Sequence, residues 1–171
     1  MSRLLWGTAA LAAIAFLAAL ALTGGRGGPG LAPFTPKGLM TMPVEGVRDV
    51  DIETPEGRWH FVRTQGGWHA TEGALAAGFE TRLDGALTLL HNSGAERVLA
   101  ESEVSETAQF GLNPPRLRVV VNRGSASRFA ISFGATNVLG LSHYARREGD
   151  REIALLPGFV AEAWERVGKA P

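Results

Sequence analysis

The sequence predicts an α+β domain behind an apolar N-terminal segment. Short strand patterns, separated by turns rich in proline and glycine, alternate with two amphipathic helical patterns in the order strands, helix, strands, helix. We therefore expect an antiparallel sheet, or sheets, with two amphipathic helices packed on them. The length of 171 residues leaves room for one core of ordinary size.

The N-terminal segment has the composition of a membrane span. From Leu4 to Leu22 every residue except Thr8 is apolar or small, and an α-helix needs about 20 such residues to cross a bilayer. Arg3 precedes this run, so the N-terminus is expected on the cytoplasmic side and the rest of the chain outside the cytoplasm. The sequence 19–21 (Ala-Leu-Ala) is typical of a cleavage site. Residues 1–23 are thus either a transmembrane anchor or a cleaved signal peptide.

A linker follows the apolar run. Residues 24–43 are rich in glycine and proline, which disfavour helix and remove backbone donors. This composition predicts a tether between the membrane and an extracytoplasmic domain over residues 44–169.

The elements of the domain follow from its periodicity. Val47, Val50 and Ile52 mark a first strand, and alternation over 58–63 marks a second on the other side of the turn at 54–57. A third strand is expected over 68–70. Apolar residues then recur at helical spacing over 79–92, which predicts an amphipathic helix. The second half of the domain also consists of strands followed by a helix. A short strand at 95–100 and a helical turn at 105–110 precede strands at 117–121, 129–133, 141–147 and 152–156 and a helix at 160–167.

Composition excludes several function classes. Seventeen basic and seventeen acidic residues cancel and form no basic stripe, so nucleic-acid binding is not expected. The chain has no cysteine, which excludes disulfides, thiolate catalysis, cysteine-based metal sites and a lipoprotein anchor.

No arrangement in the sequence predicts catalysis, a metal or a cofactor. No two of the four histidines have the i, i+4 spacing of a helical zinc site. His60 and His69, with Glu72, form the best metal-binding alternative, but strand-edge histidines are usually structural. Ser142 and His143 are neighbours in a predicted strand, so their side chains point to opposite faces and form no dyad. We expect a protein that is not an enzyme.

Two groups of residues are candidate partner contacts. Trp59 and Trp68 lie on neighbouring predicted strands, where they form either an aromatic surface or part of the core. Arg146 and Arg147 lie in a predicted hairpin and are suited to a carboxylate or phosphate, although acidic residues interleave with them.

Several motifs resemble the bacterial domain of unknown function 4340. They are Gly66-Gly67-Trp68, the segment 95–101, the segment 110–117 (Phe-Gly-Leu-Asn-Pro-Pro-Arg-Leu) and Leu155-Leu156-Pro157, in the order which that family shows. The resemblance implies a single-pass protein of the bacterial inner membrane with its C-terminal domain in the periplasm. Some family members accompany ABC-type export or gliding-motility components, and the resemblance carries over no catalytic residue.

The expected function is therefore a non-catalytic envelope protein. Residues 4–22 hold it in the membrane, and its domain docks on a partner as an accessory subunit of a membrane complex or transporter. The alternative is a periplasmic small-ligand-binding module, which predicts a pocket between the sheet and a helix.

Overall fold

A computed structural model describes residues 13–19, 35–72, 77–104, 106–124 and 127–168. The chain divides into two compact units, Met1–Thr35 and Pro36–Pro171. In the first unit, residues 13–19 are helical, and the rest of the apolar run 4–22 lies outside the described residues. Among the helices that are described, none has both the length and the apolar character needed to cross a membrane.

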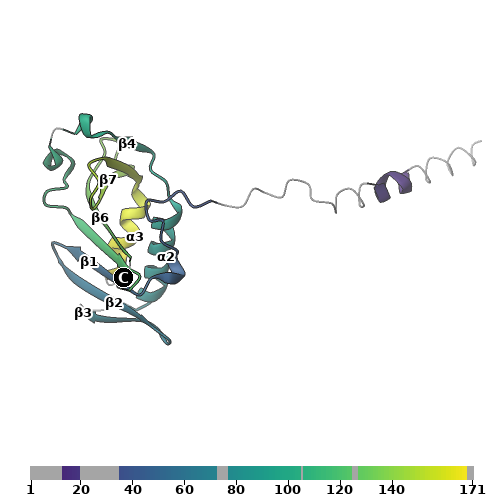
Figure 1. Ribbon diagram of the computed structural model, residues 1–171, viewed down its shortest axis with the longest axis horizontal. Coiled ribbons are helices and arrows are strands. Elements are labelled where there is room, and N and C mark those ends of the chain that lie inside the picture. Colours follow the sequence, from purple (N-terminus) through teal and green to yellow (C-terminus); the bar gives the residue numbers. More distant parts are fainter. Residues whose placement is uncertain (1–12, 20–34, 73–76, 105, 125–126, 169–171) are drawn as a thin grey trace, which may run out of the picture. The chain divides into compact units, whose positions relative to one another are not determined.

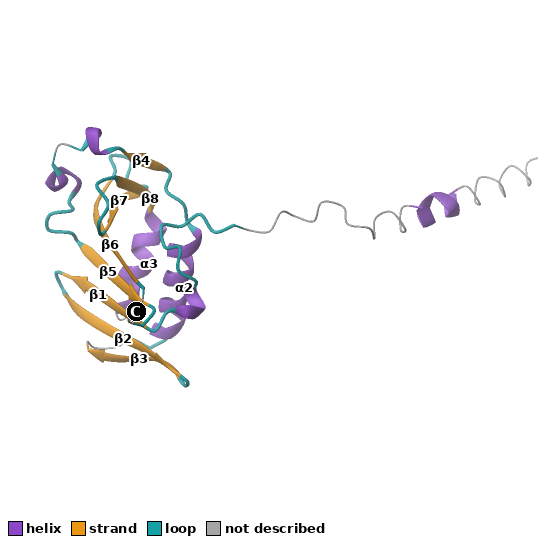
Figure 2. Ribbon diagram, viewed as in Figure 1, coloured by secondary structure: helices purple, strands orange, loops and turns teal. Residues whose placement is uncertain are grey.

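The second unit is built on one antiparallel sheet of eight strands, which confirms the α+β class (Figure 2). The strand order is β3-β2-β1-β5-β6-β7-β8-β4. The strands are β1 (Asp49–Thr54), β2 (Gly57–Thr64), β3 (Gly67–Glu72), β4 (Arg97–Leu99), β5 (Leu117–Asn122), β6 (Arg128–Thr136), β7 (Ser142–Arg147) and β8 (Ile153–Pro157). Three short 3-10 helices, η1 (Val44–Gly46), η2 (Glu101–Glu103) and η3 (Thr107–Phe110), lie in the connections.

The two predicted amphipathic helices pack on one face of this sheet, as Figure 1 shows. They are α2 (Phe79–Asn92) and α3 (Gly158–Gly168), and they contact each other. The apolar stripe of α2 and the buried side chain of Trp164 in α3 share one core with the strand side chains that face them. Burial of these stripes supplies most of the stability of short helices such as these.

The domain begins earlier than the sequence predicted. Residues 36–43 were assigned to the linker, yet Met40 and Met42 are buried in the core. The Gly38 amide donates to the His91 carbonyl at 3.0 Å. A Cβ at Gly38 would lie 2.2 Å from the Leu90 carbonyl oxygen, so only glycine fits there. The burial of Met40 and Met42 and the close fit of Gly38 make this segment part of the domain.

The segment Phe110-Gly111-Leu112 has an architectural role in the domain. Gly111 has a φ of +67°, which favours glycine, and Leu112 is buried. A Cβ at Gly134 would lie 2.1 Å from the Phe110 carbonyl oxygen, so β6 and η3 meet backbone to backbone. The Phe110 ring packs edge-on against Tyr144 at a centroid distance of 4.9 Å.

Candidate functional site

The sheet face opposite α2 and α3 carries a row of polar side chains that crosses five strands. Residues paired across neighbouring strands point to the same face. The strand registers pair Glu53 with Arg58 and with Arg118, and they pair Ser132 with Arg118 and with Arg146. We call this set the central row; its order across the sheet is Arg58, Glu53, Arg118, Ser132, Arg146.

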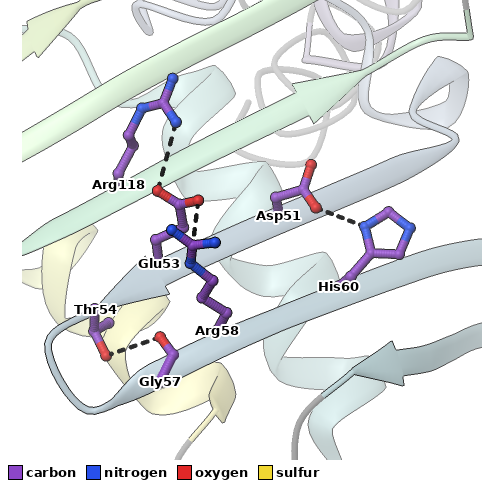
Figure 3. Close-up of polar contacts among 7 residues, drawn as sticks. All are labelled: Asp51, Glu53, Thr54, Gly57, Arg58, His60 and Arg118. Carbon is purple, nitrogen blue, oxygen red and sulfur yellow. Dashed lines mark hydrogen bonds and ion pairs between the residues drawn. The ribbon is translucent and has the colours of Figure 1, made fainter.

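Glu53 lies between two arginines in this row, as Figure 3 shows. Its Oε1 is 3.6 Å from Nε of Arg58, and its Oε2 is 3.5 Å from Nη1 of Arg118. On the adjacent row, Nδ1 of His60 is 2.6 Å from Oδ1 of Asp51. Partly exposed pairs of this kind contribute only about 0–1 kcal/mol each to stability.

A depression of about 410 Å³ opens over the other end of the central row. Arg118, Ser132 and Arg146 line it, with Ala130 beside them and Glu148 contributing to the wall. Nη2 of Arg118 is 3.5 Å from Oε1 of Glu148, and Glu148 also pairs with Arg128. Within the described ranges, neither the Arg146 guanidinium nor the Ser132 hydroxyl has a polar partner.

The two arginines that the sequence singled out have different environments. Nε and Nη2 of Arg147 each donate to a carboxylate oxygen of Asp150 at 2.9 Å. These hydrogen bonds, together with the negative charge of Asp150, raise the pKa of the Arg147 guanidinium. Arg147 is therefore satisfied within its own hairpin, while the half-buried Arg146 faces the depression.

The tryptophans do not form an aromatic surface. Trp68 is 2% exposed, and its Nε1 donates to Oδ1 of Asp84 at 2.9 Å. The Arg63 guanidinium lies 4.5 Å from the Trp68 ring centroid. Trp59 is half-buried and packs against the same core. The prediction of a partner contact at Trp68 is wrong, because this side chain faces the helices.

The histidines and Ser142 are placed in separate surroundings. In the part of the chain that the structure describes, no group of three His, Asp or Glu side chains is arranged to hold a metal ion. His60 is paired in register with Glu72, but its ring contacts Asp51 instead. The Ser142 hydroxyl donates to Oε2 of Glu96 at 2.6 Å, and the His143 ring lies 3.4 Å from the Gly134 carbonyl oxygen.

A second feature, missed by the sequence analysis, is a group of exposed apolar side chains at one end of the domain. Val138, Leu139 and Leu141 lie in the β6–β7 turn and are 102%, 76% and 69% exposed, and Phe159 at the start of α3 is 49% exposed. The Gly158 amide donates to the Leu141 carbonyl at 2.8 Å, which places Phe159 beside the turn. We call these four residues the apolar end.

Asn137 holds this turn in one conformation. Its Oδ1 accepts hydrogen bonds from the backbone amides of Leu141 and Ser142 at 3.0 and 3.3 Å. Its carbonyl accepts from the Gly140 amide at 2.9 Å, and its own amide donates to the Ser142 carbonyl at 2.8 Å. The aliphatic side chains are therefore presented on an ordered loop, which lowers the entropy cost of binding.

The chain enters the domain close to the apolar end. Lys37 contacts Gly94, where an added Cβ would meet the Lys37 Cβ at 3.2 Å. Glu96 is two residues further on, at most about 7 Å along the chain, and its carboxylate accepts from Ser142 in the strand that follows Leu141. Lys37, near the start of this unit, and the apolar end therefore lie at the same end of the domain.

The sequence predicted only part of the apolar end and of the central row. The strands predicted at 129–133 and 141–147 correspond to β6 and β7, and the structure places a turn between them. The signal that the sequence analysis missed is the presence of three apolar residues, Val138, Leu139 and Leu141, in one short turn. Turns are usually polar. The central row has no local signal, because its members come from five strands.

Comparison with known proteins gives no match: no family model, no curated protein and no solved structure is similar to this chain. The resemblance to the domain of unknown function 4340 stays a prediction that rests on the motifs quoted above.

Proposed function

We propose that the chain is a non-catalytic, membrane-tethered docking module. Residues 4–22 anchor it in a bacterial inner membrane, and the domain on the periplasmic side docks through the apolar end onto an apolar surface of a membrane-embedded partner protein. In this role it is an accessory subunit of a membrane complex or transporter. The observation that carries the proposal is the exposure of four large apolar side chains on an ordered end of the domain.

Energetics favour a binding role for these side chains. Full burial of a valine, leucine or phenylalanine side chain is worth about 1.5–3 kcal/mol, and the domain leaves this gain unused at the apolar end. Contiguous exposed apolar groups on a soluble domain usually mark an interaction site. The Asn137 hydrogen bonds keep the loop ready to bind without further ordering.

The position of the tether supports a partner in the membrane. Residues 23–35 join the apolar run to the domain, and a chain of this length reaches at most roughly 45 Å. The domain therefore stays close to the bilayer, where its local concentration near membrane proteins is high. Lys37 and the apolar end lie at the same end of the domain, and in this proposal that end faces the membrane.

Site-specific photo-crosslinking in intact cells tests this proposal. A photoreactive amino acid replaces Leu139, and the matched control carries it at Gln65, an exposed residue in the turn between β2 and β3 at the opposite end of the sheet. We expect an adduct with an integral membrane protein from position 139 only, and its loss when Val138 and Leu141 are both replaced by serine. Equal adducts at both positions, or adducts with lipid alone, would overturn the proposal.

A further inference from the structure

We propose that the central row is an oxyanion site, in which Arg118 and Arg146 hold one carboxylate or phosphate group of a ligand over Ser132. The central row and the apolar end share no residue, so this site does not depend on the docking function proposed above. It corresponds to a small-ligand role on the open face of the sheet, not between the sheet and a helix.

The order of charges along the row is the first argument. Arg58, Glu53 and Arg118 alternate in sign, so each arginine faces a carboxylate on the neighbouring strand. The next position is Ser132, and beyond it comes Arg146. Opposite charges directly across strands stabilise a sheet. The row therefore has a neutral hydroxyl at the position where the alternation would place a carboxylate.

Spacing and donor capacity fit one anionic group at this position. Neighbouring strands are about 4.8 Å apart, so the strands that carry Arg118 and Arg146 are separated by about 10 Å, with Ser132 between them. Two guanidinium groups and a hydroxyl line the same depression, and together they offer several donors for a carboxylate or phosphate. The depression of about 410 Å³ above them has the size of a small-molecule site.

The arginines retain unused donors. Both contacts of Arg118, to Glu53 and to Glu148, are 3.5 Å long, whereas N–H···O hydrogen bonds are usually about 2.9 Å. Among the residues described, Arg146 has no polar partner. A ligand oxyanion therefore gains contacts with both arginines and leaves Glu148 paired with Arg128.

The surroundings restrict the ligand to a single anionic group. Glu148 and Asp150 line the same depression, so a polyanion would meet like charges at its rim. Asp150 is held by Arg147 and stays in place. A ligand that carries one carboxylate or one phosphate on an otherwise uncharged body fits this pattern best.

Titration of the full chain in neutral detergent micelles tests the site. The probes are sodium phosphate and sodium acetate, added at constant ionic strength, and the signal is the NMR shift of the arginine side-chain Nε–H groups. We expect a saturable shift of Arg146 and Arg118 with at least one probe. The probe that saturates identifies the group as phosphate or carboxylate.

Two variants and one control test whether anion binding depends on the central row. Arg146→Gln is expected to weaken binding by about tenfold or more. Ser132→Glu places a carboxylate in the row, so it should abolish binding and raise the Tm. The control Arg151→Gln removes an exposed arginine paired with Glu101 and should leave binding unchanged. The proposal is overturned if neither probe gives a saturable shift, or if Arg146→Gln and Arg151→Gln bind the probe with the same affinity. It is also overturned if Ser132→Glu lowers the Tm.

Discussion

The same substitution at two leucines distinguishes the proposed docking surface of the domain from its core. Leu139 in the apolar end is 76% exposed, whereas Leu87 in α2 is 0% exposed and belongs to the core. We expect Leu139→Ala to change the free energy of unfolding by less than about 0.5 kcal/mol, as surface substitutions do. We expect Leu87→Ala to cost about 2–5 kcal/mol, because it leaves a cavity between helix and sheet.

The exposed fractions of the two leucines predict the opposite order for the effect of these substitutions on docking affinity. About three quarters of the Leu139 side chain is free to be buried by a partner, which corresponds to about 1–2 kcal/mol, or roughly 5- to 30-fold in affinity. Leu87→Ala should leave docking of the folded fraction unchanged, since the side chain is inaccessible. The core variant loses stability, and the surface variant loses binding.

Urea unfolding of the full chain in detergent micelles, followed by tryptophan fluorescence, measures the first part of this prediction. A cost above about 1.5 kcal/mol for Leu139→Ala would mean that this side chain packs within the domain. A cost below about 1 kcal/mol for Leu87→Ala would contradict the placement of α2 on the sheet. The first of these outcomes would refute the assignment of the apolar end as a free surface.

Three further predictions concern two glycines and the Asn137 side chain. Gly85 lies inside α2 with open space around it, so Gly85→Ala should stabilise the domain by about 0.5–1 kcal/mol in the same urea assay. Gly134→Ala should prevent stable folding, because its Cβ would meet the Phe110 carbonyl oxygen at 2.1 Å; equal stability of the two variants would contradict this packing. Asn137→Ala removes the acceptor of the Leu141 amide, so hydrogen exchange of that amide should become faster while exchange in α2 stays unchanged; an unaltered rate at Leu141 would show that the side chain does not order the turn.

Local periodicity was sufficient for most elements of the fold. The predicted helix at 79–92 has the observed bounds of α2, because its apolar residues recur every three to four positions. The strands on both sides of the turn at 54–57 were also recognisable, since alternation and turn residues act over short distances. The structure of residues 36–43 was predicted wrongly, because composition does not report where Met40 finds its contacts.

The sequence identified the site residues less completely, because their contacts depend on the tertiary structure. Arg146 and Arg147 look alike in the sequence, and only the contacts of Asp150 distinguish the satisfied guanidinium from the one that faces the depression. The sequence left both a surface and a core position open for Trp68, and the packing of α2 decided for the core.

The sequence by itself determined the α+β class, the two amphipathic helices and the apolar run at 4–22, because each depends on residues close together in the chain. Only the tertiary structure decided that β1 lies beside β5, which brings Glu53 next to Arg118. The physical reason is that strand pairing is non-local and its register depends on packing. A shift of one residue would turn every side chain of a strand to the other face, and the central row would no longer exist.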